Sequence, residues 1–242
     1  MDCDSLELIP YLPYILQDFH EIGSHAKSLL NIINSLKPDR MIKVLDLGCG
    51  KGAVTCYIAE NIDSTCLGID AIPEFIDYAN NYRDKRNISN CKFIVDDIRN
   101  LQCVENTYDF IIIGSVGPIF ENYTIAMGSF KSILKDDGYI LLDDGYMENG
   151  KKHPITLSKE ELFFQIINAG MYIETEFKGN DICVEDEFEG QMDNIKLRCN
   201  QLINNYPEKE NLFRKFIEKQ EKEYSNLESE ITCSTLAIRK LD

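Results

Sequence analysis

The chain has 242 residues, 44% of them hydrophobic and 27% charged, a composition that excludes a disordered protein and fits one large soluble domain. Its 25 lysines and arginines against 41 aspartates and glutamates give a net charge of −16, which disfavours nucleic acid and anionic membranes as partners. No segment reaches the roughly 18 uncharged apolar residues of a membrane span, and the acidic start Met1-Asp2-Cys3-Asp4 is unlike a signal peptide. We therefore predict a cytoplasmic protein.

The first forty residues predict a helical segment that is interrupted. Pro10 and Pro13 punctuate its start, and an amphipathic period runs from Leu29 to Leu36 before Pro38 stops it. After that, short apolar runs alternate with amphipathic stretches of helix length. The runs that predict strands are 43–47, 66–69, 91–95, 110–113 and 139–142, and the stretches that predict helices are 53–61, 73–86 and 123–134. This alternation predicts a doubly wound (Rossmann-like) α/β fold whose parallel sheet is covered on both faces.

The last third of the chain differs in character. Ser158 and Glu161 predict a capping box that opens a helix up to Ala169, which Gly170 ends, and 171–177 predicts a strand. Residues 181–230 predict two helices separated near Pro207, followed by a closing strand at 232–239. No linker divides the chain, so we predict a single domain. Its parts are an N-terminal helical cap (1–40), a cofactor-binding core (41–180), a helical insertion (181–230) and the closing strand (231–242).

Nine cysteines and three histidines are scattered along the chain, and no two cysteines have the C-x-x-C spacing of a zinc site. We therefore predict no metal centre. In a reducing compartment the cysteines are expected to stay free thiols, most of which pack as small apolar side chains.

The stretch Val44-Leu45-Asp46-Leu47-Gly48-Cys49-Gly50-Lys51-Gly52 indicates a ligand site. A buried strand runs into a tight turn with three glycines at alternate positions, and a helix follows. Glycine suits such a turn because it tolerates positive φ and, lacking a Cβ, lets a ligand lie against the backbone. Because Gly48-x-Gly50-x-x-Ala53 also satisfies a dinucleotide-binding fingerprint, the turn alone leaves the ligand open.

Acidic residues at the ends of three successive predicted strands indicate which class of ligand the glycine turn binds. Asp46 precedes the first glycine, where a carboxylate suits an ammonium and is unfavourable beside a pyrophosphate. Asp70 ends the second strand, where it can accept both hydroxyls of a ribose. Asp97 ends the third strand and can accept from the adenine amino group, with Ile98 near the ring. A phosphate-free cation with an adenosine end fits this pattern, and S-adenosylmethionine is such a molecule.

With these residues in place, the sequence resembles the class I S-adenosylmethionine-dependent methyltransferases, closely over about 43–142 and loosely elsewhere. Residues 46–52 match their glycine-rich motif, 68–70 their ribose-binding acid, and Asp97-Ile98 their adenine-binding motif; 108–112 and 134–140 match the fourth strand and the turn into the fifth. The resemblance implies a seven-stranded, mostly parallel sheet whose last strand is antiparallel. It also implies S-adenosylmethionine as cofactor. The residues then expected at the cofactor are Asp46, Gly48, Cys49, Gly50 and Gly52 for the methionine end, Asp70 and Ala71 for the ribose, Asp97 and Ile98 for the adenine, and Gly114, Ser115 and Gly23 beside them.

One departure from the superfamily narrows the acceptor. Members that methylate amino groups of bases usually carry an Asn/Asp-Pro-Pro-Tyr/Phe motif after the fourth strand, where this chain reads Gly114-Ser115-Val116-Gly117. Together with the net charge, this favours a small-molecule acceptor over nucleic acid. In similar enzymes variable segments cover the acceptor, which here are the N-terminal helices and the 181–230 insertion. The sequence does not fix the oligomeric state, and a homodimer is one option.

Methyl transfer from a sulfonium needs alignment and exclusion of water, and a weakly acidic acceptor also needs a base. The candidate bases are Asp144, Tyr146 and His153, with Ser115, Glu121 and Asp143 also near the predicted strand ends. Simpler interpretations compete with these roles: Asp143-Asp144-Gly145 is typical of a turn, and His153 of a solvated loop.

Three further features of the sequence are candidates for the site or its cover, and the last two also have a simpler interpretation. Gly23 and Ser24 are candidates for a segment that folds over the cofactor. The aromatic residues Tyr11, Tyr14 and Phe19 suit either an acceptor pocket or helix packing. The acidic run at 185–189 is either a solvated surface or an attractor for a cationic amine.

Two alternative functions stay open at this point. A nicotinamide-dependent oxidoreductase would need a hydrophobic residue in place of Asp46 and a pyrophosphate site. A non-catalytic partner subunit would keep the fold without turnover and use the helices of 184–228 as a binding surface.

Overall fold

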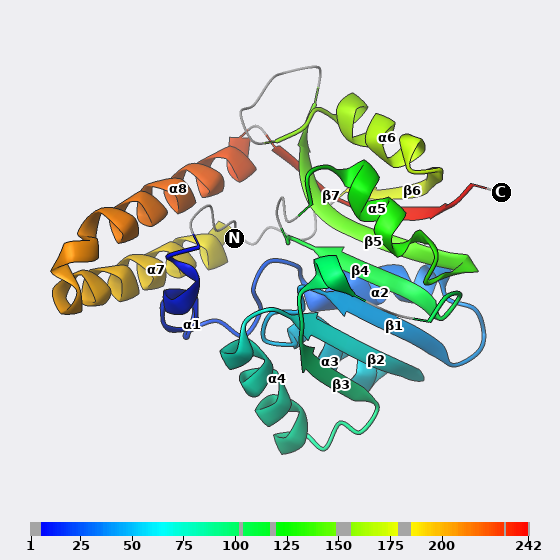
Figure 1. Ribbon diagram of the computed structural model, residues 1–242, viewed down its shortest axis with the longest axis horizontal. Helices are drawn as coiled ribbons and strands as arrows, with labels where there is room; N and C mark the ends of the chain where they lie inside the picture. Colours follow the sequence, from blue (N-terminus) through cyan, green and yellow to red (C-terminus); the bar gives the residue numbers. More distant parts are fainter. Residues whose placement is uncertain are drawn as a thin grey trace.

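A computed structural model describes residues 6–101, 104–116, 120–148, 156–178, 185–229 and 231–241. A seven-stranded sheet lies at its centre, in the order β3-β2-β1-β4-β5-β7-β6 (Figure 1). Strands β1 to β5 pair in parallel, whereas β7 is antiparallel to both of its neighbours. The predicted sheet, with its antiparallel last strand, is confirmed. The strands are β1 (Ile42–Leu47), β2 (Ser64–Asp70), β3 (Cys91–Val95), β4 (Tyr108–Gly114), β5 (Leu134–Met147), β6 (Met171–Lys178) and β7 (Ile231–Lys240).

Helices cover both faces of this sheet. The helices are α1 (Leu12–Ile15), α2 (Ala26–Leu36), α3 (Ala53–Asn61), α4 (Pro73–Lys85), α5 (Tyr123–Lys131), α6 (Lys159–Asn168), α7 (Glu185–Asn205) and α8 (Glu210–Ser229), with short 3-10 turns η1 (Ile9–Tyr11), η2 (Ile98–Asn100) and η3 (Pro207–Lys209). Apolar side chains of α2, α3 and α4 form one core with the sheet, and those of α5 and α6 form a second core on the opposite face. The two predicted helices of the insertion are present and separate at η3.

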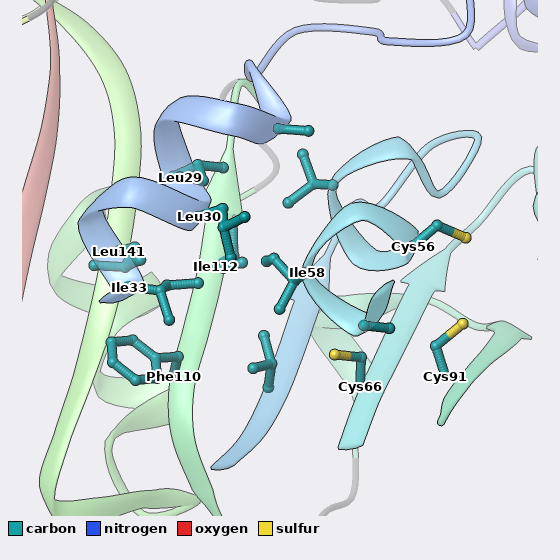
Figure 2. Packing of buried hydrophobic residues seen from close by; sticks show 14 of the residues in the cluster. Leu29, Leu30, Ile33, Cys56, Ile58, Cys66, Cys91, Phe110, Ile112 and Leu141 are labelled. Atoms are coloured by element: carbon teal, nitrogen blue, oxygen red, sulfur yellow. The ribbon is translucent and has the colours of Figure 1, made fainter. Parts of the chain in front are cut away.

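In the core under α2 and α3, the apolar residues that recur at helical spacing are buried against the sheet. The side chains of Leu29 and Ile33 come from α2, and that of Ile58 comes from α3. They pack against Phe110 and Ile112 of β4 (Figure 2). The thiols of Cys56, Cys66 and Cys91 are buried in the same layer. Among the described residues six cysteines are free, as predicted, and several of them pack as small apolar side chains.

Local sequence rules hold well at α6. The side chain of Ser158 accepts from the amide of Glu161, and the Glu161 carboxylate accepts from the amide of Ser158. Gly170 follows the helix with φ +70°, a left-handed conformation that ends a helix at low cost for glycine. The capping box and the glycine stop are therefore both confirmed.

The region around β5 differs from expectation. The helix predicted to reach residue 134 ends at Lys131, because the carbonyl of Ile133 accepts from the amides of Thr107 and Tyr108 at 2.9 and 3.0 Å. Strand β5 then continues past residue 142 to Met147, paired with β7 along its whole end. Asp143 and Asp144 consequently lie inside a strand, and their interpretation as turn residues is wrong.

A third apolar cluster, which we call the helical cap, joins segments far apart in the sequence. It contains Leu12, Ile15 and Phe19 of the N-terminal part, Phe75 of α4, and side chains of α7 and α8 that include Ile195 and Phe213. In Figure 1, α1 lies against α7, and the α7–α8 hairpin extends away from the sheet. The N-terminal residues up to Ile22 and the insertion thus form one structure beside the carboxyl ends of the strands. Helix α2, which was predicted to belong to an N-terminal helical cap over 1–40, instead packs on the sheet beside α3.

The amino end of the sheet is held by a buried carboxylate, Asp109. It accepts from the amide of Lys43 at 2.7 Å and from the ammonium of Lys135 at 2.9 Å, and it pairs with Arg40 at 2.5 Å. Burial opposes ionisation, but these donors outweigh it and lower the pKa of Asp109 below its ordinary 3.8. Its stabilising contribution is therefore present at neutral pH and is lost on acidification through the lowered pKa.

Replacing Asp109 with Ala is expected to destabilise the protein by about 3 kcal/mol, because the Lys43 amide and two cations lose a buried partner. Urea denaturation at neutral pH measures this loss. Asp137 is the matched control: it pairs with Arg40 at 3.2 Å, but its side chain is 64% exposed, so Asp137→Ala should cost less than about 1 kcal/mol. Equal losses in the two variants would contradict the role given to Asp109.

Within the described ranges every helix is too short or too polar to span a bilayer. Across the same ranges, His, Cys, Asp and Glu side chains form no group of three or more that is arranged to hold a metal ion.

Candidate cofactor site at the carboxyl ends of the strands

The turn after β1 has the backbone that its glycines predict. Gly48, Gly50 and Gly52 all have positive φ, at +71°, +50° and +77°. The amides of Gly48 and Cys49 donate to the carbonyl of Ile69 at 2.8 and 2.9 Å, which ties the turn to the end of β2. Gly52 caps the start of α3 in the left-handed conformation. We call residues 48–52 the glycine loop.

The three glycines have different surroundings. A Cβ on Gly48 would lie 2.8 Å from Val116, and a Cβ on Gly52 would lie 2.7 Å from the Phe93 ring. These two glycines make room for the protein's own side chains. A Cβ on Gly50 would meet nothing within 4 Å, so open space lies beside the middle of the glycine loop. A ligand has access to the backbone there.

Asp70 borders this open space and fixes the glycine loop. Its Oδ2 accepts from the amide of Gly50 at 2.9 Å, and its Oδ1 accepts from the amide of Ile72 at 2.9 Å. Burial raises the pKa of the Asp70 carboxyl, and these backbone donors oppose the rise. Each carboxylate oxygen has a further lone pair, so the side chain can hold the loop and accept ligand hydroxyls together. Ala71, the next residue, is exposed at the strand end.

Asp46 is placed deeper than the sequence suggested. Its side chain is only 4% exposed, and its Oδ2 accepts from the hydroxyl of Thr55 on α3 at 2.5 Å. Burial raises the pKa of Asp46 to about 6. The carboxylate thus joins β1 to α3; its predicted contact with the methionine end stays a prediction. The Cys49 thiol is partly buried nearby, and burial raises its pKa as well.

The end of β3 carries Asp97 and Ile98. The Asp97 carboxylate accepts from the backbone amide of Arg99 at 3.0 Å and from its guanidinium at 2.5 to 3.0 Å, which lowers the pKa of Asp97. Ile98 is buried, with 6% of its surface exposed. Arg99 is therefore a neighbour of the predicted adenine-binding acid that sequence reasoning did not include.

The N-terminal segment meets the end of β4 through two Gly–Ser pairs. A Cβ on Gly23 would lie 2.7 Å from the Cβ of Ser115, and one on Gly114 would lie 2.2 Å from the Oγ of Ser24. Each glycine thus makes room for the serine of the other segment. The Oγ of Ser24 is buried and has no hydrogen-bond partner, and Ser115 has an unusual positive φ of +49°. The predicted cofactor candidates Gly23, Gly114 and Ser115 are brought together.

The candidate bases are not brought together. Asp144 accepts from the hydroxyl of Tyr123 and from the amide of Gly145. Tyr146 is 0% exposed and its hydroxyl donates to Glu176. Because an acceptor cannot reach this buried hydroxyl, the placement favours a structural role for Tyr146. His153 lies outside the described residues. Asp143 accepts from Thr235 at 2.7 Å, and Glu121 is exposed.

The aromatic candidates of the N-terminal part face the insertion. Tyr11 packs edge-on against Phe213, with ring centroids 5.0 Å apart, and the hydroxyl of Tyr14 donates to Gln201 at 2.7 Å. Phe19 is buried in the helical cap. Helix packing therefore accounts for these side chains.

Besides Arg99, sequence reasoning missed two further residues of the site. Phe93 of β3 packs over both Gly52 and Gly68, and Lys51 is 4% exposed although it sits in the middle of the glycine loop. A lysine between two loop glycines was visible in the sequence, but its partners come from a distant segment.

The buried Asp46 gives a pH prediction. A pKa that rises from 3.8 to about 6 on folding means that the folded state holds the proton more tightly, so the stability from this group falls as pH rises from about 4 to about 6. Asp46→Asn keeps an oxygen for Thr55 and removes the charge. Its free energy of unfolding relative to the wild type should therefore improve by about 2 kcal/mol between pH 4.5 and pH 7.5.

Urea denaturation of the wild type and Asp46→Asn at these two pH values measures the effect, with the exposed Asp96→Asn as control. Parallel pH dependence of wild type and Asp46→Asn would contradict the burial of a charged carboxylate at this position.

Residues 38–185 match the model of a methyltransferase domain family. The match includes the glycine loop, Asp70 and the strands from β1 to β6, which is more than half of the chain. The chain therefore belongs to this methyltransferase family.

Individual relatives are more distant. The chain is 39% identical over 91 residues to the 2-heptyl-1-hydroxyquinolin-4(1H)-one methyltransferase of Mycobacteroides abscessus, a match that covers 38% of this chain and 39% of that protein. It is 32% identical over 126 residues to phosphoethanolamine N-methyltransferase of Triticum aestivum, covering 52% of this chain and 24% of that protein. These matches thus span less than half of each relative's length.

Among solved structures, a methyltransferase of Thiobacillus denitrificans in complex with S-adenosylhomocysteine has a similar fold. The TM-score is 0.74 at 17% identity, and the alignment covers 99% of this chain and 100% of that one. At this identity the likeness concerns the fold, including both the helical cap and the sheet.

Proposed function

We propose that this protein binds S-adenosylmethionine against the glycine loop and transfers its methyl group to a small-molecule acceptor. One observation carries the proposal: the Asp70 carboxylate holds the amide of Gly50 at 2.9 Å, and open space lies beside Gly50 at the carboxyl ends of β1 and β2. Ligands of doubly wound sheets bind at this edge. Membership of a methyltransferase family and the S-adenosylhomocysteine in the Thiobacillus denitrificans structure support the choice of ligand.

The residues present fit such a cofactor in chemical terms. Asp70 accepts from the ribose hydroxyls, with Ala71 beside it, and Asp97 with Ile98 receives the adenine. The methionine end lies along Gly48, Cys49, Gly50 and Gly52, with Asp46 beneath. Gly23, Gly114 and Ser115 lie at the side of the methionine end. A sulfonium also suits this acidic site better than a pyrophosphate does.

When bound, the cofactor would supply a methyl group activated by its sulfonium, because a neutral thioether leaves as the acceptor forms its bond to the methyl carbon. The protein's own part is to align the acceptor in line with that bond and to exclude water. The N-terminal segment and the helical cap stand beside the strand ends where such exclusion is needed. Of Asp144, Tyr146 and His153, Asp144 is the one that is both described and partly exposed, since Tyr146 is buried.

The acceptor is a small molecule. The two relatives named above carry a quinolone and phosphoethanolamine in their names, and both are small molecules. The net charge of −16 opposes binding of nucleic acid, and we expect a cytoplasmic enzyme. Light scattering of the full chain tests whether it forms a homodimer.

Three measurements test this function. Calorimetry should detect binding of S-adenosylmethionine and S-adenosylhomocysteine, and thermal shift should show no stabilisation by NAD. Incubation with labelled S-adenosylmethionine and fractionated metabolites, followed by mass spectrometry, should then show a small molecule that gains one methyl group. Binding of NAD instead of S-adenosylmethionine, or a methylated nucleic acid as product, would overturn the proposal.

A further inference from the structure

Lys51 of the glycine loop is buried, with 4% of its surface exposed. Its ammonium donates to the carbonyls of Leu16 and Phe19, both at 2.7 Å, and lies 4.8 Å from the centre of the Tyr78 ring. Burial lowers the pKa of Lys51, and the nearby carboxylate of Asp18 opposes this. A buried ammonium is costly unless its hydrogen bonds are made, so these two carbonyls fix residues 16–19 to the loop.

The segment from Leu16 to His25, which we call the strap, has a second attachment. It runs from Lys51 at the glycine loop to the end of β4, where Gly23 and Ser24 interlock with Gly114 and Ser115. The strap therefore joins the two sides of the candidate cofactor site. Two of its buried polar atoms, Nδ1 of His20 and Oγ of Ser24, have no hydrogen-bond partner.

The strap is also attached to α7. The Arg198 guanidinium donates to both oxygens of Asp18 at 2.7 and 2.8 Å and to Gln201 at 3.1 Å. Just before the strap, Tyr14 donates to the same Gln201 at 2.7 Å. Side chains of the strap and of α7, such as Leu16 and Ile195, share the apolar cluster of the helical cap.

We infer that Lys51 is a positioning residue through which the occupied glycine loop holds the strap and α7 in place, so that cofactor binding and closure of the helical cap are coupled. A ligand seated against Gly50 restrains the loop and with it the adjacent Lys51. Lys51 restrains Leu16 to Phe19, and Asp18 passes the restraint to Arg198. The acceptor would then meet a closed cap only when the cofactor is present. This inference rests on the proposed placement of the cofactor.

Hydrogen–deuterium exchange of the full chain, with and without S-adenosylhomocysteine, tests this coupling. In the wild type the ligand should slow exchange in the glycine loop and, by about tenfold, in residues 195–203 of α7. In Lys51→Met, at ligand concentrations that saturate the site, the loop should still be protected while the ligand-dependent change in α7 falls below about twofold. If Lys51 had a purely structural role, Lys51→Met would alter exchange in α7 equally in the free and the ligand-bound protein.

A second variant covers the case in which Lys51→Met fails to fold. Arg198→Met breaks the contact of the strap with α7 at a side chain that is 23% exposed, and it should also abolish the response of α7. The matched control is Arg214→Met, which removes an ion pair within α8 and should leave that response intact.

The outcomes separate the two proposals. Absence of S-adenosylhomocysteine binding in the wild type would overturn the proposed function. Binding with no response of α7 in the wild type, or with a full response in Arg198→Met or in a folded Lys51→Met, would overturn the coupling alone.

Discussion

Asp70→Ala is expected to weaken binding of S-adenosylhomocysteine by at least about a hundredfold, which corresponds to about 3 kcal/mol. Two effects add. The carboxylate no longer accepts from the ribose, and hydrogen bonds to charged groups are worth about 1.5–3 kcal/mol. In addition, the amide of Gly50 loses its 2.9 Å partner, so the glycine loop is no longer held in the conformation that receives the ligand. Calorimetry on the folded variant measures the loss.

The matched control for this variant is Asp63→Ala. Asp63 is exposed just before the other end of the same strand, β2, and its removal should leave binding within about twofold of the wild type. Because burial raises the pKa of Asp70, the affinity of the wild type should begin to fall on acidification at a higher pH than an ordinary aspartate would cause. Undiminished affinity in Asp70→Ala would mean that the adenosine end binds elsewhere.

The sequence predicts those parts of the fold that depend on local chemistry. Apolar runs place the strands, and the Ser158–Glu161 capping box and Gly170 mark both ends of α6. The glycine loop follows from the alternating glycines at 48, 50 and 52, because positive φ is a property of the single residue. Strand β5 was predicted too short because its last residues are stabilised by pairing with β7, some 90 residues away, which no local pattern contains.

The candidate site is predictable only in part, for the same reason. The order of acids after three strands places Asp46, Asp70 and Asp97 near one edge of the sheet, since parallel strands end together. What each carboxylate contacts depends on other segments: Thr55 covers Asp46, and Arg99 pairs with Asp97. The partners of Lys51 lie more than 30 residues away, and the pairing of Gly23–Ser24 with Gly114–Ser115 joins segments that share no periodicity.

The same substitution at two glycines of the glycine loop should affect different properties of the protein. Gly52→Ala forces a side chain into the left-handed region at φ +77° and places its Cβ 2.7 Å from Phe93 and 2.8 Å from Ala79. The conformation costs about 1–2 kcal/mol and the overpacking about 1–3 kcal/mol, so we expect a destabilisation of about 2–5 kcal/mol in urea denaturation without ligand.

Gly50→Ala has the same kind of backbone, with φ +50°, but its Cβ meets nothing within 4 Å. Its loss of stability should stay near the conformational cost of about 1–2 kcal/mol, whereas its affinity for S-adenosylhomocysteine should fall by at least about tenfold. The new methyl group occupies the open space where the ligand approaches the backbone, so it obstructs binding without disturbing the core. Gly52→Ala should thus mainly lower stability, because Gly52 faces the protein. Gly50→Ala should mainly lower affinity, because Gly50 faces the proposed position of the ligand. If Gly50→Ala bound the ligand as the wild type does, the open space beside the glycine loop would not be the cofactor site.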